Sequence, residues 1–191
     1  MQFPAKHIVI FASGAGSNAQ KIIDHFKNSD RIKVSLIVCN NPIAGVIQIA
    51  ANEKIPVLMI DKKTFAATGY ADEIKKYKPD LIVLAGFLWK IPPALLNIYK
   101  NKIINIHPAL LPEFGGKGMY GNAVHEAVVA QGKKQSGITI HFVDELYDHG
   151  KTIFQATCNV SENDTAESLA AKIHLLEHKY YPIEIEKLLN R

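Results

Sequence analysis

The first half of the chain alternates short apolar runs with segments of helical periodicity. Residues 7–12 are almost continuously apolar, as expected of a strand buried on both faces of a sheet, and residues 18–27 place their apolar side chains on one helical face. Alternation of strand and helix is typical of βαβ units around a parallel sheet. Further strands are predicted at residues 32–39, 57–60, 81–85 and 102–106, and further helices at 45–53, 65–77 and 93–99.

The second half follows a different pattern. The predicted elements are a glycine-rich loop over residues 111–121, a helix around 124–128, and two strands, 137–143 and 151–160, joined by a polar turn. The last helix is long, and Asp164 is expected to cap it in a capping box with Glu167. Pro182 is a candidate kink in that helix. Together the two halves predict a doubly wound α/β fold with a mainly parallel sheet, a C-terminal strand pair and a long final helix.

Composition and charge narrow the class of protein. The chain has 191 residues and a hydrophobic fraction of 48%, which predicts one compact domain rather than disorder. Its apolar runs fall far short of the roughly 20 residues of a membrane span, and residues 8–12 are too short for a secretory signal. Cys39 and Cys158 cannot form a disulfide framework, so a reducing cytoplasm is expected.

The net charge of +4 is spread along the chain, and only two arginines occur, Arg31 and Arg191. Nucleic-acid binding usually needs a concentrated basic stripe. We therefore expect small anionic ligands, with no nucleic acid or membrane as partner.

A glycine-rich turn, Ser13-Gly14-Ala15-Gly16-Ser17-Asn18-Ala19, lies between the first strand and the first helix. Glycine lets the backbone approach a ligand closely, and a helix N-terminus attracts anions. A dinucleotide site would also need an acidic residue after the second strand, where this chain has Cys39-Asn40-Asn41. The motif therefore favours a single phosphate, held also by the side chains of Ser17 and Asn18. A plain tight turn is the alternative.

The segment Asn105-Ile106-His107-Pro108 ends a predicted parallel strand. Residues i and i+2 of a strand face the same side, so Asn105 and His107 project together at the edge where such sheets bind ligands. An amide can stabilise an oxyanion while an imidazole moves protons, which suits acyl transfer. A histidine that merely caps the strand end is the alternative.

An acidic turn follows the strand that ends near His141. A carboxylate such as Asp148 is expected to orient His107 and to raise its pKa by charge attraction. A metal site of His107, His141 and Asp148 is a weaker hypothesis, because tight ligand spacing is absent. On the residues alone, Glu177 and His178 are expected to be surface groups.

The sequence contains no Gly-x-Ser-x-Gly elbow and no Walker A motif, and neither cysteine has an activating neighbour in sequence. A covalent nucleophile is not indicated. Direct attack by a substrate amine is the simpler hypothesis.

Four motifs together resemble the phosphoribosylglycinamide formyltransferase family. They are Gly14-Ala15-Gly16-Ser17-Asn18, Leu84-Ala85-Gly86-Phe87, the segment from Asn105 to Pro112, and the segment from His141 to Gly150. The resemblance covers about residues 7–188. It implies a Rossmann-like formyltransferase fold in one domain, residues 1–191. The phosphate site would lie in about residues 1–100, and the catalytic and folate sites in about 101–191.

The resemblance also implies an activity. Enzymes of this family transfer the formyl group of 10-formyltetrahydrofolate to the amine of glycinamide ribonucleotide, the third step of purine synthesis. The implied catalytic residues are Asn105, His107 and Asp148. The implied ribonucleotide contacts are Gly16, Ser17, Asn18 and Glu177. The implied folate contacts are Leu88, Trp89, Lys90, Ile91, Asn105, Asp144, Glu145, Leu146, Tyr147 and Asp148. No metal is implied, and the protein is expected to be a monomer or homodimer.

Some positions depart from the family pattern. Trp89-Lys90 replaces a stretch that often contains arginine, Thr68 falls where some relatives have an arginine, and the loop 113–121, with Lys117, differs from commoner versions. Other folate enzymes are the nearest alternatives in chemistry: a formyltetrahydrofolate hydrolase or a tRNA formyltransferase, each of which typically carries an extra domain. A non-catalytic nucleotide-binding module is the alternative from another class.

Overall fold

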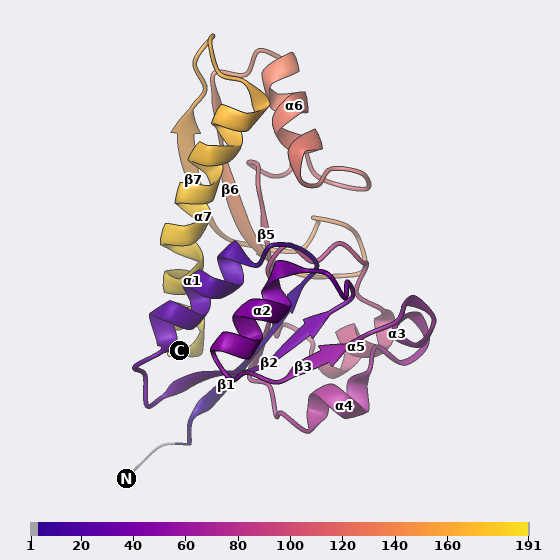
Figure 1. The fold of residues 1–191 in the computed structure, drawn as a ribbon. Helices are drawn as coiled ribbons and strands as arrows, with labels where there is room; N and C mark the ends of the chain where they lie inside the picture. The colour runs from indigo at the N-terminus through magenta and orange to yellow at the C-terminus, as the bar shows by residue number, and fades with distance from the viewer. Residues whose placement is uncertain (1–3, 191) are drawn as a thin grey trace.

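The computed structural model describes residues 4–190, which are organised around one seven-stranded sheet (Figure 1). The strand order is β3-β2-β1-β4-β5-β6-β7. The strands are β1 (Lys6–Ala12), β2 (Ile32–Cys39), β3 (Val57–Met59), β4 (Leu81–Leu84), β5 (Ile103–His107), β6 (Gln135–Phe142) and β7 (Thr152–Asn159). The helices are α1 (Ser17–Phe26), α2 (Gly45–Asn52), α3 (Lys62–Thr68), α4 (Ala71–Lys75), α5 (Pro93–Ile98), α6 (Asn122–Ala130) and α7 (Ala166–Leu189).

The strands are parallel except at one edge of the sheet. β3, β2, β1, β4 and β5 pair in parallel, whereas β6 and β7 add to the β5 edge in antiparallel fashion. The predicted α/β class, with a mainly parallel sheet, a C-terminal strand pair and a long final helix, is confirmed. In Figure 1 the antiparallel strands extend away from the parallel part, with α6 beside them.

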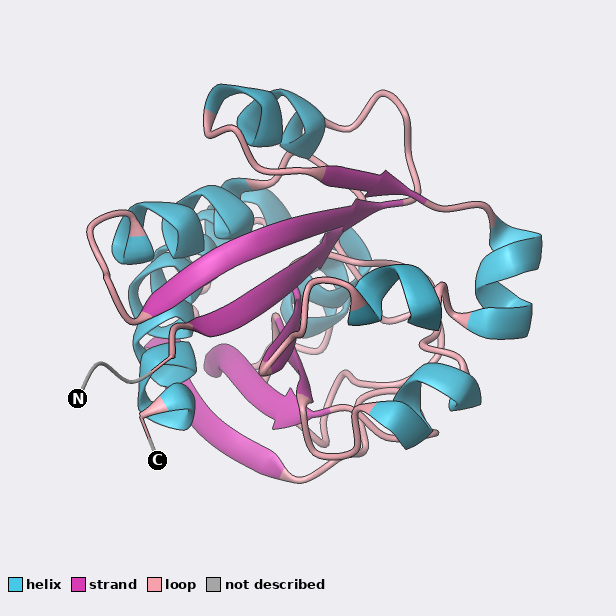
Figure 2. Ribbon diagram, turned by 90° about the horizontal axis from the view of Figure 1, so that it is seen from below, coloured by secondary structure: helices cyan, strands magenta, loops and turns pink. Residues whose placement is uncertain are grey.

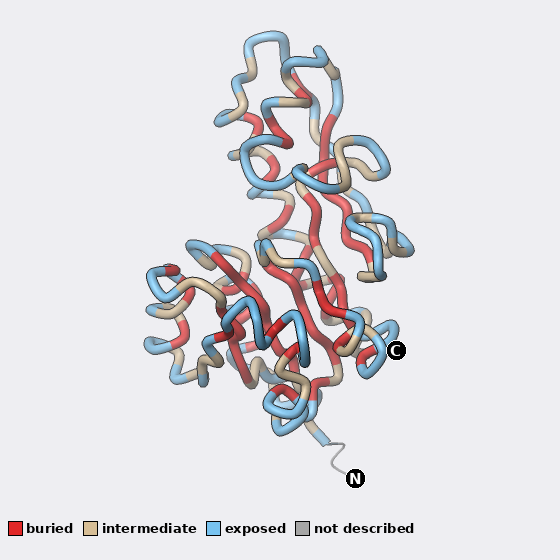
Figure 3. Tube along the Cα trace, turned by 90° about the vertical axis from the view of Figure 1, so that its right-hand side faces the viewer, coloured by how far each residue is buried: buried red, intermediate tan, exposed pale blue. Residues whose placement is uncertain are grey.

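Helices cover both faces of the sheet (Figure 2). Side chains alternate along β1, so Ile8 and Ile10 pack in the core under α1, α2, α6 and α7, while Val9 and Phe11 pack in the core under α3, α4 and α5. These four side chains are fully buried. Buried segments, red in Figure 3, run through the interior of the molecule. This double burial explains why residues 8–12 of β1 are apolar without interruption.

Two predictions about helices were wrong. The predicted helix 65–77 is broken into α3 and α4, because Gly69 and Tyr70 both adopt left-handed backbone angles, with φ of 62° and 54°. The capping box of α7 uses Thr165 and Ser168 rather than Asp164 and Glu167. Asp164 instead accepts hydrogen bonds from the Ser161 backbone and the Ser168 hydroxyl.

The helix α7 crosses the sheet and continues through Pro182 to Leu189. Tyr181 is fully buried, and its hydroxyl donates to the carbonyl of Leu84 at 2.9 Å. That hydrogen bond anchors the middle of α7 to the carboxyl end of β4. Among the described residues, none of the helices is both long and apolar enough to cross a membrane.

Replacing Tyr181 with phenylalanine is expected to lower the free energy of unfolding by about 1–2 kcal/mol, because a buried carbonyl loses its donor. Chemical denaturation measures this. Tyr180→Phe, at the half-buried neighbouring position, is the matched control and is expected to change stability by less than about 0.5 kcal/mol. Equal stability of Tyr181→Phe and the wild type would show that the bond does not anchor α7.

Candidate active site

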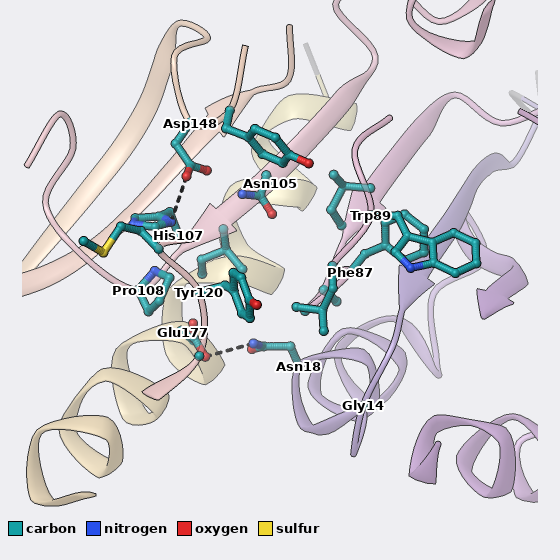
Figure 4. A pocket seen from close by; sticks show the side chains of 18 of the residues that line it. Gly14, Asn18, Phe87, Trp89, Asn105, His107, Pro108, Tyr120, Asp148 and Glu177 are labelled. Atoms are coloured by element: carbon teal, nitrogen blue, oxygen red, sulfur yellow. Dashed lines mark hydrogen bonds and ion pairs between the residues drawn. The ribbon is translucent and has the colours of Figure 1, made fainter. Parts of the chain in front are cut away.

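A cavity of about 860 Å³ opens at the carboxyl ends of β1, β4 and β5 (Figure 4). Open α/β sheets bind ligands at this edge. The cavity joins four segments that are distant in sequence: the glycine turn before α1, the loop after β4, the end of β5 with the loops that follow it, and one face of α7. The predicted catalytic, ribonucleotide and most of the folate residues therefore line one continuous space.

The glycine turn forms one end of the cavity. Gly16 has φ of +84°, and a Cβ atom there would lie 2.8 Å from Cβ of Val46, so the turn requires glycine. The N-terminus of α1 follows, with Ser17 and Asn18 in its first turn. The first backbone N–H groups of a helix lack partners within the helix and can bind an anion.

Glu177 of α7 lies against this turn. Its side chain is only 7% exposed, and Oε2 accepts a hydrogen bond of 2.9 Å from the Asn18 amide (Figure 4). The expectation from the residues alone, that Glu177 is a surface group, was wrong. Its carboxylate is held inside the cavity, because α7 crosses next to α1.

Asn105 and His107 project together from β5, as the strand periodicity predicts. Asn105 pairs in register with His141 of β6, and the amide Nδ2 lies 3.2 Å from Nε2 of His141. Nδ1 of His141 lies 2.8 Å from the Phe142 carbonyl, to which it donates, so Nε2 accepts from the Asn105 amide. One N–H of that NH₂ group is engaged, and the other is left to bind an oxyanion.

His107 is fixed by a backbone carbonyl. Its Nε2 lies 2.8 Å from the oxygen of Phe114, to which it donates, and its Nδ1 lies 3.5 Å from Oδ2 of Asp148 (Figure 4). Because Nε2 carries the donated proton, Nδ1 is the nitrogen that can accept another one. Asp148 faces the position where that second proton would arrive.

Asp148 is itself held firmly. Its backbone lies in the left-handed region with φ of 55°, which is uncommon for residues other than glycine, and Oδ2 accepts from the Gly116 N–H at 3.0 Å. Burial alone would raise the pKa of Asp148, but hydrogen bonds and the nearby His141 and His107 outweigh it and lower that pKa. The group is therefore a carboxylate at neutral pH.

Asp148 raises the pKa of His107, as predicted, but burial outweighs that effect and the net shift is downward. The side chain is nearly fully buried, and burial lowers its pKa; the carboxylate of Asp148 and the Phe114 carbonyl raise it, but by less. His107 is consequently neutral at neutral pH. A neutral imidazole is the form that can take a proton from an amine.

The three residues considered as a metal site lie close together. Nε2 of His141 lies 3.6 Å from Oδ1 of Asp148, and Nδ1 of His107 lies 3.5 Å from Oδ2. Within residues 4–190, however, no group of His, Cys, Asp and Glu side chains has the arrangement of a metal site.

The predicted folate residues divide into two sets. Leu88, Trp89, Lys90, Asp144, Leu146 and Tyr147 line the cavity. Ile91 is buried in the core under α3, α4 and α5, Glu145 is exposed, and neither Glu145 nor Thr68 of α3 lines the cavity.

An aromatic wall bounds this side of the cavity. The rings of Phe87 and Trp89 lie 6.2 Å apart (Figure 4). Both rings also contact the ring of Phe65. Across the opening, Nζ of Lys90 lies 5.9 Å from the centre of the Tyr147 ring. This apolar, aromatic surface with a cation at its rim suits an aromatic ligand that carries acidic groups.

Sequence reasoning missed two histidines of the site, His125 and His174, which line the cavity near Glu177. The signal for His174 is its spacing of three residues from Glu177, which places both on one helical face. His125 has no such local signal. His141 was named only as a candidate metal ligand, whereas in the structure it positions Asn105.

The model of the formyl transferase family matches residues 6–185. The chain belongs to the formyl transferase family. Among its relatives, the phosphoribosylglycinamide formyltransferase of Bacillus subtilis is 40% identical over 190 residues, which cover 96% of this chain and 95% of that protein.

 The chloroplastic enzyme of the same name from Vigna unguiculata is 42% identical over 189 residues. This formyl transferase chain spans 61% of the length of that plant relative.

Solved structures of the family share the fold of this formyl transferase. Phosphoribosylglycinamide formyltransferase from Bacillus halodurans superimposes with a TM-score of 0.89 at 36% identity, over 97% of this chain and 96% of that one. Glycinamide ribonucleotide transformylase 1 from Geobacillus kaustophilus gives a TM-score of 0.88 at 37% identity, over 97% and 99% of the two chains.

Proposed function

We propose that this protein transfers the formyl group of 10-formyltetrahydrofolate to the amine of N1-(5-phosphoribosyl)glycinamide, the third step of de novo purine synthesis. The observation that carries the proposal is one cavity that joins the N-terminus of α1 to Asn105, His107 and Asp148. The names of the relatives, which are phosphoribosylglycinamide formyltransferases, support the same choice of substrates.

The two substrates would enter from opposite sides. The phosphate of the ribonucleotide would bind at Gly16, Ser17 and Asn18, with Glu177 beside the ribose. The folate would lie against the aromatic wall and the turn that carries Tyr147, with Lys90 near its acidic tail. The formyl carbon and the glycinamide amine would then meet beside Asn105.

In the proposed reaction the neutral amine attacks the formyl carbon, and a carbon–nitrogen bond forms. The formyl oxygen becomes an oxyanion and accepts the free N–H of Asn105. Nδ1 of His107 takes the proton from the attacking nitrogen, and Asp148 stabilises the imidazolium that results. His107 then gives the proton to the folate nitrogen as its bond to the formyl carbon breaks. Side chains supply each step, so the scheme uses neither metal nor ATP.

We further propose that the enzyme acts in the cytoplasm on small molecules alone, as a monomer or homodimer. The two free cysteines and the dispersed positive charge support this.

Label transfer tests the proposed reaction. The protein is incubated with glycinamide ribonucleotide and with 10-formyltetrahydrofolate that carries ¹³C in its formyl group. We expect the label on the glycinamide nitrogen, one equivalent for each folate deformylated, as mass spectrometry and NMR would report. Label found only as free formate would contradict transfer and indicate a hydrolase.

A further inference from the structure

Gln155 is an exposed residue of the edge strand β7, yet its side-chain amide is held by two hydrogen bonds. Nε2 donates to the carbonyl of Leu111 at 3.0 Å and to the hydroxyl of Thr139 at 2.9 Å. An exposed glutamine usually gains little from a fixed conformation, because the loss of rotamer freedom opposes its hydrogen bonds. Here both hydrogens of the NH₂ group are engaged by the protein.

Gln155 ends a row of three side chains that begins at His107. In the register of the sheet, His107 of β5 lies opposite Thr139 of β6, and Thr139 lies opposite Gln155 of β7. Residues directly opposite each other on neighbouring strands place their side chains on the same face, a few ångströms apart. The row therefore connects the proposed base with the edge of the sheet, although Thr139 and Gln155 themselves lie outside the lining of the cavity.

The loop that follows His107 folds back over this row. Thr139 is fully buried; its hydroxyl donates to the carbonyl of Ala109 at 2.7 Å and accepts from the N–H of Leu111 at 2.9 Å. With the bond from Gln155, the hydroxyl makes one hydrogen bond as donor and two as acceptor, which is all it can make. Leu111 is consequently held through both its N–H and its carbonyl.

Three residues after Leu111, the same loop supplies the carbonyl that holds His107. The oxygen of Phe114 accepts from Nε2 of His107 at 2.8 Å. The segment between them is also held by an ion pair of Glu113 with Lys133, whose side chains are partly exposed, so the pair contributes little. Leu111 is therefore an anchor for the turn that carries the Phe114 carbonyl.

The place of that carbonyl decides which nitrogen of His107 carries the proton. Oδ2 of Asp148 lies 3.5 Å from Nδ1, and a carboxylate attracts a ring N–H more strongly than a neutral carbonyl does at equal distance. At 2.8 Å the Phe114 carbonyl is the closer partner, so Nε2 keeps the proton and Nδ1 can accept one. If the carbonyl moved away, the proton would shift to Nδ1, toward Asp148, and His107 would lose its basic nitrogen there.

We propose that Gln155 is a positioning residue for formyl transfer: together with Thr139 it fixes the loop at Leu111, so that the Phe114 carbonyl holds His107 in the tautomer whose Nδ1 is the base. This inference rests on the proposed function, because it gives Gln155 a part in that reaction. It assigns a role in the reaction to a side chain that does not touch the substrates.

The ¹⁵N chemical shifts of the His107 ring test the proposal in the whole protein without substrates, because protonated and unprotonated nitrogens of a neutral imidazole have well-separated shifts. The spectrum of His107→Gln identifies the His107 signals by their loss. At about pH 8, where His107 is neutral, we expect the wild type to carry the proton on Nε2. Gln155→Met keeps the length of the side chain and removes its donors, so we expect the two ring shifts to move toward each other as the proton divides between the nitrogens.

Steady-state kinetics complete the comparison. Gln155→Met should lower kcat for formyl transfer about tenfold, the effect of losing roughly one net hydrogen bond at Leu111. The KM for the ribonucleotide should stay within about twofold, because Gln155 lies outside the cavity lining. Asn159→Leu, which removes another exposed amide from β7, is the matched control and should equal the wild type in kcat and in the ring shifts.

A second pair of variants tests the same anchor at Thr139. Thr139→Val removes the hydroxyl that holds Ala109 and Leu111, and should lower kcat more than Gln155→Met does. Thr139→Ser keeps the hydroxyl and should restore kcat to within about threefold of the wild type, with the proton again on Nε2 of His107. Thermal melting of each variant reports whether it is folded.

Three results would overturn the proposal: a proton on Nδ1 of His107 in the wild type, unchanged ring shifts in folded Gln155→Met, or a kcat of that variant within about twofold of the wild type. The label-transfer experiment decides the proposed function separately. Formyl transfer by the wild type with unchanged shifts in Gln155→Met would reject the role of Gln155 alone. The expected shifts without formyl transfer by the wild type would reject the enzyme, and with it any role in the reaction, while the link between Gln155 and His107 would stand.

Discussion

Replacing Asn105 with alanine is expected to lower kcat for formyl transfer by about 100-fold or more, the loss typical of an oxyanion donor. The structure gives the reason. His141 fixes the Asn105 amide so that one N–H points to His141 and the other is free. Alanine removes the free donor and leaves no side chain that replaces it at that position of β5. Steady-state kinetics with both substrates saturating measure the effect.

Asn97→Ala, an exposed position on α5, is the control for this substitution and should retain wild-type activity within about twofold. A drop of less than threefold in the folded Asn105→Ala protein would remove Asn105 from the catalytic step. It would favour a non-catalytic nucleotide-binding module that keeps the fold.

Replacing Asp148 with asparagine is expected to lower kcat by about 100-fold or more, which lies within the usual range for general acid–base groups. Asparagine has the same shape and can still accept the N–H of Gly116, so the loop should keep its position. What disappears is the negative charge 3.5 Å from His107 Nδ1. Without it the imidazolium formed during the reaction is buried and unpaired. Asp30→Asn, at an exposed position, is the control.

The pH profile separates this role of Asp148 from a purely structural one. Activity requires neutral His107, so kcat/KM should fall as the pH drops through the lowered pKa of His107. The carboxylate of Asp148 raises that pKa, so its removal should move the acidic limb of the residual activity to lower pH. An acidic limb at the wild-type pH would contradict direct coupling between Asp148 and His107.

The parts of the fold that could be predicted from the sequence are those with local signals. The predicted strand 32–39 coincides with β2, whose second half, residues 36–39, is apolar and buried. The break between α3 and α4 was missed, because the apolar periodicity continues across Gly69 and Tyr70 although their backbone angles end the helix. The capping box of α7, formed by Thr165 and Ser168, begins one residue after the predicted cap, Asp164.

The residues of the candidate site also differ in whether a local sequence pattern could predict them. Asn105 and His107 could be predicted, because the period of two along a strand places them together. The contact between Asn105 and His141 depends on the antiparallel register of β5 and β6, which no local pattern encodes. Glu177 entered only through the family resemblance, since its burial results from the packing of α7 against α1. The effect of Asp148 on the pKa of His107 could be predicted, whereas the larger, opposite effect of burial could not, because the sequence does not show how deeply the side chain is buried.

Release of deformylated folate by the purified protein, measured with and without glycinamide ribonucleotide, tests the central claim most directly. The account predicts release that depends on the ribonucleotide and saturates with it, because the amine is the nucleophile and its phosphate is held at Gly16, Ser17 and Asn18. Equal release in the absence of the ribonucleotide would mean that water is the nucleophile at Asn105, His107 and Asp148. No release with both substrates present would contradict catalysis by this cavity.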